Sequence, residues 1–383
     1  MGLGVDLMAL FKFTKNITDL ADADVHFICV GTPQVKGGNA ADLTYVNSAI
    51  ESIAKVVKPG GLVVGKSTVP VGTATRLRNR LIELNPKADL AWNPEFLREG
   101  FAVEDTLHPN RLVVGVVNDQ AEKILKEVYA VNLKENTPWV RADLPTAELV
   151  KVAANSFLAT KISFINAMAE ICEAAGGDVT VLAKAIGYDP RIGSRFLQAG
   201  IGFGGGCLPK DIRAFMARAE ELGASQAVEF LKEVDAINLR ARQRIIELVR
   251  KDLSDDLQGK KVAILGAAFK PDSDDVRDSP ALDIAAQIQA AGAVVTVHDP
   301  KAIVNAQKRF PALKFAEDID NTLKDAEIVL HLTEWKIYRE IDPVKAKSLV
   351  KSAIMIDGRN ALDRTTWQSA GWKFRALGRA NNE

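Results

Sequence analysis

Apolar positions change their spacing along the first third of the chain. Short apolar runs predict buried strands, and the stretches between them carry apolar residues at the spacing of a helix face. This alternation is typical of βαβ units, in which helices cover both faces of a parallel sheet. The predicted strands are residues 25–30, 62–69, 88–92 and 111–116, and the predicted helices are residues 43–57 and 72–84.

The pattern becomes helical after residue 142. A stretch of about 30 residues beginning at Thr146 contains neither Pro nor Gly and is closed by Gly176 and Gly177, which predicts one long helix. A helix of this length normally crosses between domains or packs on a second subunit. Further helices are predicted at residues 179–186, 214–222 and 228–251, with a glycine-rich loop at 200–206.

The last third of the chain returns to alternating strands and helices. We therefore predict an α/β fold with two Rossmann-like doubly wound domains, joined by a long central helix and an all-α dimerisation region. The predicted regions are residues 1–142, 143–256 and 257–383. In the last of these, strands are predicted at 262–265, 294–298, 328–332 and 353–356, and a helix at 281–291.

Composition narrows the class of ligand and the compartment. The 49 basic and 49 acidic side chains cancel, so no global field favours nucleic acid or a membrane surface. Three scattered cysteines form no disulfide framework, which indicates a reducing compartment, and no apolar run approaches the ~20 residues that span a bilayer. The histidines lack metal-ligand spacing. We expect a soluble, cytoplasmic protein without a metal, which holds any anionic ligand locally.

The most unusual segment is GIGFGGGCLPKD at residues 200–211. Its glycines let the backbone approach a ligand closely, and Lys210 follows Cys207 by three positions. A nearby cation helps to hold a thiolate, so we interpret Cys207 as a nucleophile. The alternative is a mobile linker with an incidental thiol. The G-x-G-x-x-G match inside this segment follows no predicted strand and is therefore not interpreted as a dinucleotide-binding loop.

The other two cysteines are interpreted differently. Cys29 lies in an apolar strand and Cys172 on an apolar helix. We expect both to be core residues, since unpaired cysteines are among the residues most often buried.

A second candidate site follows the predicted strand 88–92. Residues 93–100, NPEFLREG, place Glu95 and Glu99 at the carboxyl end of a strand, where open α/β sheets bind ligands. Two such carboxylates could perform acid–base chemistry. The alternative is a solvated first helical turn, in which acidic residues complement the helix dipole.

Two polar residues interrupt an apolar part of the predicted long helix. Lys151 and Asn155 are four positions apart and therefore project from one face. A cation beside an amide donor can stabilise an oxyanion. The alternative is a lysine whose ammonium group reaches solvent beside a polar seam.

Further polar side chains follow other predicted strands. Thr32, in GTP at 31–33, and Thr68, in STVPVGT at 67–73, could bind a ligand or could be turn and cap residues. Near strand ends in the last third stand three cations that would suit a phosphate-rich ligand. These are Lys270, Arg277 and Arg359.

Together these segments resemble the UDP-glucose/GDP-mannose dehydrogenase family. The resemblance covers almost the whole chain, and the order of its motifs is more specific than any one of them. The motifs are GTP at 31–33, STVPVGT at 67–73, NPEFLREG at 93–100, Lys151 with Asn155, GFGGGCLPKD at 202–211, FKPDSDDVRDS at 269–279 and DGR at 357–359.

The resemblance implies oxidation of a nucleotide sugar by NAD. The sugar C6 alcohol would become a carboxylate through two hydride transfers, with a thiohemiacetal and then a thioester on Cys207. UDP-glucose is the favoured substrate and GDP-mannose the alternative. The resemblance further implies Glu95 as general acid/base, Lys151 and Asn155 as oxyanion donors, and Asp211 with Thr68 as the residues that position a water.

Binding roles are implied as well. The cofactor contacts would be Thr32, Thr68, Glu99, Lys210 and Arg277. The substrate contacts would be Glu95, Phe96, Leu97, Arg98, Lys151, Asn155, Arg191, Gly204, Lys270 and Arg359. Arg191 would reach the substrate of a partner subunit, because the family resemblance also implies a homodimer or a higher homo-oligomer with the long helix in its core.

The chain departs from the family pattern in two ways. Family members open with a βαβ unit that carries a glycine-rich pyrophosphate loop, and we expect this chain to begin after that unit, which would weaken NAD binding. A truncated, non-catalytic nucleotide-sugar-binding paralogue is therefore a further alternative. Gly206 stands where many relatives carry Ser, and we expect little effect from it.

Overall fold

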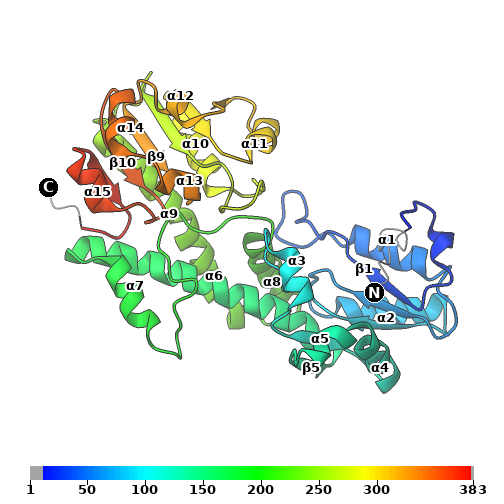
Figure 1. Ribbon diagram of the computed structural model, residues 1–383. Helices are drawn as coiled ribbons and strands as arrows, with labels where there is room; N and C mark the ends of the chain where they lie inside the picture. Colours follow the sequence, from blue (N-terminus) through cyan, green and yellow to red (C-terminus); the bar gives the residue numbers. More distant parts are fainter. Residues whose placement is uncertain (1–11, 381–383) are drawn as a thin grey trace, which may run out of the picture. The chain divides into compact units, whose positions relative to one another are not determined.

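The computed structural model describes residues 12–380, and its chain divides into two compact units, Met1–Ala153 and Ala154–Glu383 (Figure 1). The expectation about the beginning of the chain concerns residues outside the described range. Each unit contains one sheet, so the predicted α/β fold with two Rossmann-like domains is confirmed.

The sheet of the first unit has the strand order β1-β2-β3-β4-β5. Its strands are β1 (Val25–Ile28), β2 (Leu62–Gly65), β3 (Asp89–Trp92), β4 (Leu112–Gly115) and β5 (Trp139–Ala142). Its helices are α1 (Thr44–Ile53), α2 (Thr73–Leu84), α3 (Ala102–Leu107), α4 (Asp119–Val128) and α5 (Ala130–Lys134), after the 3-10 turn η2 (Ile17–Leu20).

Apolar side chains are buried on both faces of this sheet, as the continuous apolar runs predict. In β2, Val63 packs in the cluster that contains residues of α1 and α2, whereas Leu62 and Val64 pack in the cluster that contains Ala121 and Leu125 of α4. Leu62, Val63 and Val64 therefore need apolar side chains, since both faces of the strand are buried.

Two details of the first sheet contradict the sequence prediction. β3 and β4 pair antiparallel, through Trp92 and Gly115, so the sheet is mixed and not parallel throughout. Their connection contains only the short helix α3, which buries none of its residues, and therefore lacks the packed crossover helix that joins parallel neighbours. In β1, which is an edge strand of the described sheet, Phe27 is 38% exposed, so this strand is not buried on both faces.

The second unit begins within the long helix α6 (Leu144–Ala175), which confirms the predicted helix. Helices α7 (Val179–Gly187), α8 (Leu208–Glu221) and α9 (Phe230–Asp252), with the short turn η3 (Ser225–Val228), follow it. Buried residues of α6 form two apolar clusters with these helices, one around Ala159 and one around Ile165.

A six-stranded parallel sheet completes the second unit, in the order β11-β10-β9-β6-β7-β8. This is the doubly wound order, which reverses between β6 and β9, and open α/β sheets bind ligands at the carboxyl ends of strands at such a reversal. The strands are β6 (Lys261–Leu265), β7 (Val294–His298), β8 (Lys314–Phe315), β9 (Ile328–His331), β10 (Ile354–Asp357) and β11 (Lys373–Ala376). The helices are α10 (Pro280–Ala290), α11 (Ile303–Arg309), α12 (Ile319–Leu323), α13 (Lys336–Arg339), α14 (Pro343–Leu349) and α15 (Arg364–Ser369).

Candidate functional site

Carboxyl ends of neighbouring strands bring the predicted threonines of the first unit together. Thr32 follows β1 and Thr68 follows β2, and the Thr32 hydroxyl donates to the Thr68 carbonyl at 2.6 Å. The Ser67 hydroxyl donates to the Val30 carbonyl at 2.6 Å. These bonds fix the two loops against each other at the edge where the sheet can bind a ligand.

Residues 93–100, which we call the NPEF loop, hold Glu95 beside Lys151. The Glu95 Oε1 atom lies 3.1 Å from the Lys151 ammonium nitrogen, and the other carboxylate oxygen accepts the Leu97 backbone N–H at 2.6 Å. Lys151 is 5% exposed, so its charge is held by this ion pair and not by solvent. The alternative in which the ammonium group reaches solvent is therefore wrong.

The remaining side chains of the NPEF loop differ in exposure. The centroid of the Phe96 ring lies 3.8 Å from the Arg111 guanidinium carbon and 5.4 Å from the Lys151 ammonium nitrogen. Leu97 and Arg98 are exposed, and Arg98 pairs with Asp105 at 2.6 Å. Glu99 is half-buried. The loop is therefore anchored near β3 and open toward its end.

A buried polar cluster beneath this edge was missed from the sequence. The Lys66 ammonium group and the Tyr129 hydroxyl both donate to the Asn93 side-chain oxygen, at 2.9 and 2.5 Å. Burial lowers the pKa of Lys66, and burial together with nearby Cys29 raises the pKa of Tyr129 to about 12. Lys66 and Asn93 directly follow β2 and β3, so their position at strand ends was the available signal.

The cysteines only partly follow their predicted roles. Cys172 is buried in an apolar cluster of α6 and α7, as predicted. The prediction that Cys29 is a core residue is wrong, because Cys29 is exposed just after the edge strand β1. Cys207 is exposed, which a nucleophile requires.

Residues 200–207, which we call the cysteine loop, present Cys207 from a buried backbone. Positions 200–205 are buried, whereas Cys207 itself is exposed at the N-terminal end of α8. The linker alternative is therefore wrong, since a mobile linker has no buried anchor. The predicted helix start at residue 214 is also wrong: α8 begins at Leu208, with Pro209 in its first turn.

Three predicted residues meet beside the cysteine. Asp211 is 3% exposed and accepts the Asn155 side-chain N–H at 2.7 Å, while the Lys210 ammonium group lies 2.5 Å from its other oxygen. The Asp211 backbone N–H donates to the Cys207 carbonyl at 2.9 Å. The carboxylate therefore holds an amide and a cation close to the start of α8.

Two glycines of the cysteine loop have close neighbours. A Cβ atom on Gly204 would lie 2.2 Å from the Asp278 carbonyl oxygen, which belongs to the backbone, so Gly204 leaves no room for a side chain. A Cβ atom on Gly206 would lie 2.4 Å from the guanidinium carbon of Arg277, which is the far end of a flexible, exposed side chain and can shift. The expectation of little effect at Gly206 stays a prediction.

The cations of the second sheet lie at the predicted strand ends. Lys270 is half-buried beside the Phe269 ring, and Arg277 pairs with Asp275 at 2.7 Å. Arg359 follows β10, and its guanidinium donates to backbone carbonyls at 2.8 to 3.0 Å. The acceptors are Leu332, Gly202 and Phe269.

The pKa of Arg359 is shifted from its ordinary value. Burial lowers its pKa, the Glu334 carboxylate opposes this shift, and nearby Arg242 adds to it. The structure thus places Arg359 on the backbone of the cysteine loop, while its predicted contact with substrate stays a prediction.

Arg191 stands apart from these clusters. Its side chain is 88% exposed in the turn after α7, where it pairs with Asp189 at 2.6 Å. The predicted contact of Arg191 with the substrate of a partner subunit stays a prediction.

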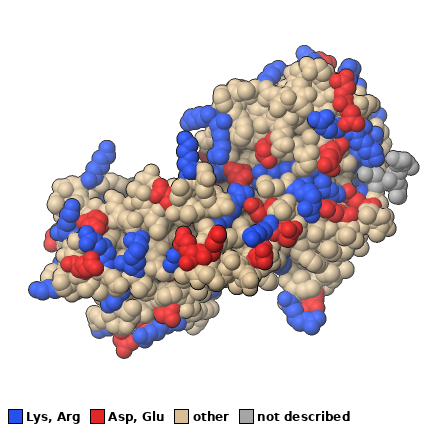
Figure 2. Space-filling model, turned by 180° about the vertical axis from the view of Figure 1, so that it is seen from behind, with Lys and Arg blue, Asp and Glu red and all other residues tan. Residues whose placement is uncertain are grey.

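The surface, the helices and a cavity add three observations. On the face shown in Figure 2, acidic and basic side chains are intermixed. Among residues 12–380, no helix combines the length and the apolar character that a bilayer crossing requires. A cavity of about 540 Å³ lies between α1 and α2, lined by residues such as Asn47, Arg76 and Arg80, and none of the predicted site residues lines it.

The geometry defines a class of protein with two α/β units that carry polar loops at strand ends and an exposed cysteine on a buried loop. The sequence matches three descriptions of the UDP-glucose/GDP-mannose dehydrogenase family: the NAD binding domain over residues 6–132, the central domain over 145–240 and the UDP binding domain over 263–364. The chain belongs to the UDP-glucose/GDP-mannose dehydrogenase family.

Individual relatives agree with this assignment. The chain is 40% identical to a UDP-glucose 6-dehydrogenase of Rhizobium meliloti (strain 1021), over 96% of this chain and 85% of the relative. It is 42% identical to a UDP-glucose 6-dehydrogenase of Rickettsia conorii, over 96% and 84%. The solved structure of a UDP-glucose dehydrogenase from the archaeon Pyrobaculum islandicum superimposes with a TM-score of 0.87 at 35% identity, covering 96% of this chain and 83% of that one.

The family's cofactor, NAD, fits part of the first unit. Thr32 and Thr68 supply hydroxyl groups at the carboxyl edge of the sheet. The N-terminus of α2, however, already binds a carboxylate, since the backbone N–H groups of Gly72 and Ala74 each donate to Glu148 at 2.7 Å. Within residues 12–380, α2 is therefore not placed to hold the pyrophosphate of NAD.

Proposed function

We propose that this protein oxidises UDP-glucose to UDP-glucuronate as an NAD-dependent UDP-glucose 6-dehydrogenase. The observation that carries the proposal is the cysteine loop, which presents an exposed Cys207 beside Lys210 and the buried Asp211. The relatives named above as UDP-glucose dehydrogenases support UDP-glucose as the substrate over GDP-mannose.

Cys207 carries the carbon that is oxidised. The C6 alcohol loses a hydride and a proton, and the Cys207 sulfur adds to the resulting aldehyde to give a thiohemiacetal. Loss of a second hydride and a proton gives a thioester. Water then adds to the thioester carbon, the C–S bond breaks, and the carboxylate leaves with the thiol restored. NAD, when bound, accepts one hydride in each oxidation.

The residues around the reacting carbon have separate roles in this proposal. Lys151 and Asn155 stabilise the oxyanions. Fixed hydrogen-bond donors stabilise a negatively charged oxygen most strongly in a site that excludes water. Glu95 accepts the proton of the hydrolytic water, because its carboxylate is held in place by Lys151. Asp211 and Thr68 position that water.

The binding residues are proposed on the family resemblance. Thr32, Thr68 and Glu99 from the first unit, with Lys210 and Arg277 from the second, would contact NAD. The substrate would contact the first unit through Glu95, Phe96, Leu97, Arg98 and Lys151, and the second through Asn155, Gly204, Lys270 and Arg359. The three-part division at residues 142 and 256 is proposed on the similar limits of the family matches.

A second copy of the chain is proposed to cover α6. Phe157, Phe164 and Ile171 are seven residues apart and 66%, 48% and 61% exposed, so they form one apolar stripe. A homodimer would cover the stripe, and Arg191 would reach the substrate of the partner. Light scattering of Phe157→Glu and Phe164→Glu variants tests the dimer.

We also propose a cytoplasmic location, because the three scattered cysteines form no disulfide framework.

The proposed function is tested by NADH formation, followed by absorbance, with UDP-glucose and with GDP-mannose. We expect NADH from UDP-glucose, loss of activity in Cys207→Ser and retained activity in Cys172→Ala, whose thiol is buried in a core. NADH from GDP-mannose alone would favour the alternative substrate. Tight UDP-glucose binding without any NADH would favour the non-catalytic paralogue.

A further inference from the structure

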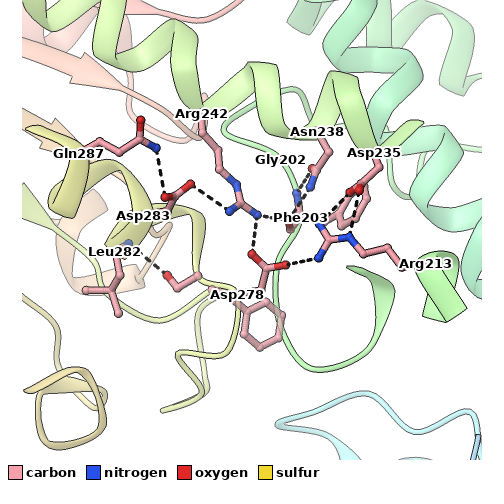
Figure 3. A network of polar contacts seen from close by, with 12 residues as sticks. Gly202, Phe203, Arg213, Asp235, Asn238, Arg242, Asp278, Leu282, Asp283 and Gln287 are labelled. Atoms are coloured by element: carbon pink, nitrogen blue, oxygen red, sulfur yellow. Dashed lines mark hydrogen bonds and ion pairs between the residues drawn. The ribbon is translucent and has the colours of Figure 1, made fainter. Parts of the chain in front are cut away.

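The backbone of the cysteine loop is held by a side chain from another helix. Asn238, in the middle of α9, is fully buried. Its side-chain oxygen accepts the Phe203 N–H at 2.7 Å, and its side-chain nitrogen donates to the Phe203 carbonyl at 3.0 Å (Figure 3). Phe203 lies four residues before Cys207, so this paired contact fixes the chain directly ahead of the cysteine.

Arg242 adds a second contact to the same residue from the next turn of α9. It is 4% exposed, and its guanidinium donates to the Phe203 carbonyl at 3.3 Å. It also pairs with Asp278 at 3.0 Å and with Asp283 at 3.2 Å. Figure 3 shows the Arg242 guanidinium between Asp283 and Phe203, with Asp278 beneath it. The buried charge is thus balanced while it binds the loop.

Asp278 extends the network past the cysteine. It also lies 3.6 Å from Arg213, which belongs to α8 six residues after Cys207, and Arg213 pairs with Asp235 of α9 at 3.0 Å. The Asp278 backbone has φ +44°, a conformation unfavourable for a residue other than glycine. Two arginines thus stabilise a strained turn whose carbonyl oxygen packs against Gly204.

The alternative is that this network only stabilises the fold, as other buried ion pairs could. Buried ion pairs, however, often add little stability over apolar packing of the same volume, because their charges must leave water. Here two buried side chains, Asn238 and Arg242, both bind the backbone of Phe203, four residues ahead of the exposed Cys207. What they supply is a fixed position for the loop.

We propose that Asn238 and Arg242 are positioning residues, which hold the cysteine loop so that Cys207 meets the sugar C6 carbon. The proposal rests on the proposed function for its kinetic consequence. Misplacement of a reacting atom by about 1 Å can cost roughly 100-fold in rate. Neither residue contacts the reacting atoms in this account.

The test uses variants that keep size and change one contact. Asn238→Asp keeps the acceptor for the Phe203 N–H and loses the donor to its carbonyl. Arg242→Lys keeps the charge and loses the branched donor. Asp283→Asn removes one partner of Arg242 at a partly exposed position, so it retains a folded chain if the buried variants do not fold.

Matched controls make the same substitutions away from the loop. Asn85 also joins backbone groups, donating to the Val57 carbonyl at 2.9 Å and accepting the Lys87 N–H at 3.3 Å. Arg375 is buried and pairs with the buried carboxylate of Asp252 at 2.7 Å. Asn85→Asp and Arg375→Lys therefore report the cost of losing such contacts without touching the cysteine loop.

The measurements are kcat, the KM for UDP-glucose, the melting temperature, and the rate at which iodoacetamide alkylates Cys207, followed by peptide mass spectrometry. We expect Asn238→Asp and Arg242→Lys to lower kcat about 10- to 100-fold with KM within about twofold, and Asp283→Asn to have a smaller effect in the same direction. The alkylation rate should change with kcat. The controls should lower the melting temperature alone.

Two outcomes separate this proposal from the proposed function. Loop variants whose kcat and alkylation rate match those of the controls, despite a lower melting temperature, would overturn the positioning role. A wild-type chain that forms no NADH from UDP-glucose would overturn the function, while a change of alkylation rate confined to the loop variants would still support positioning.

Discussion

The NPEF loop and the cysteine loop differ in how much of each loop is buried. The NPEF loop is anchored near β3 by the Glu95 contacts but exposes Leu97 and Arg98. The cysteine loop is buried from residue 200 to residue 205 and exposes Cys207. Cys207, the proposed nucleophile, thus follows a buried backbone that Asn238 and Arg242 hold, whereas Glu95, the proposed acid/base group, is held by one ion pair and one backbone N–H in a more open loop.

The largest effect is expected where that ion pair is broken. Lys151→Met leaves Glu95 without its cation and removes a proposed oxyanion donor, so kcat should fall roughly 100- to 1,000-fold. Lys126→Met is the matched control, because Lys126 also pairs with a glutamate of the first unit, Glu122, but is partly exposed. NADH formation by the two variants is the measurement. Equal activity of both would remove Lys151 from the mechanism.

Glycine substitutions test how tightly the backbone is packed at Gly204 of the cysteine loop and at Gly31 of the first unit. Gly204→Ala brings a Cβ against the Asp278 carbonyl oxygen, in a turn that Arg242 and Arg213 bind. It should lower the free energy of unfolding by about 3 kcal/mol. Gly31→Ala, in the first unit, meets no atom within 4 Å and should change it by less than about 0.5 kcal/mol. Urea unfolding measures both. Similar losses at the two positions would contradict the contrast in packing.

The turn behind the cysteine loop should respond to acid. His331 lies 2.8 Å from the buried Asp357 carboxylate, which also accepts backbone N–H groups, including that of Arg359 at 3.0 Å. Burial opposes ionisation, but His331 and these hydrogen bonds lower the pKa of Asp357. Because the folded pKa is depressed, this stability is present above the unfolded pKa and is lost as pH falls through the folded value.

Asp357→Asn tests that dependence. At pH 7 it should lower the free energy of unfolding by about 1.5 kcal/mol, and the difference from wild type should shrink below about pH 4. Urea unfolding across this range is the measurement. A difference that stays constant with pH would show that the Asp357 charge does not support the turn.

The smallest effect is expected at the open end of the NPEF loop. Arg98→Ala removes an exposed ion pair with Asp105, so the melting temperature should not change measurably. If Arg98 contacts the substrate, the KM for UDP-glucose should rise roughly three- to tenfold with kcat unchanged. An unchanged KM would remove Arg98 from the substrate contacts.

Periodicity predicted those elements that bury a regular face. The long helix α6 and the apolar strands β2 and β6 follow directly from the spacing of their residues. The direction in which β3 and β4 pair could not be predicted, because it depends on whether the connecting segment packs as a crossover. The start of α8 was open to prediction, since Pro209 and Asp211 are typical of a helix N-terminus.

The site was predictable in its residue types but not in its contacts. Cys207 stood out by its glycines, yet nothing in the spacing linked it to Asn238 or Arg242, which look like ordinary polar residues of a helix. Likewise Lys151 resembled a solvent-seeking lysine until Glu95 proved to be its partner. Contacts between distant segments decide such roles, and local sequence patterns do not contain them.

The central claim is that Cys207 holds the sugar through two oxidations. The most direct measurement supplies limiting UDP-glucose and excess NAD to the enzyme and counts NADH by absorbance against UDP-glucuronate by mass spectrometry. We expect two NADH for each sugar consumed, with a covalent adduct on Cys207 trapped by acid quenching. One NADH per sugar, with a released aldehyde and no adduct on Cys207, would contradict it.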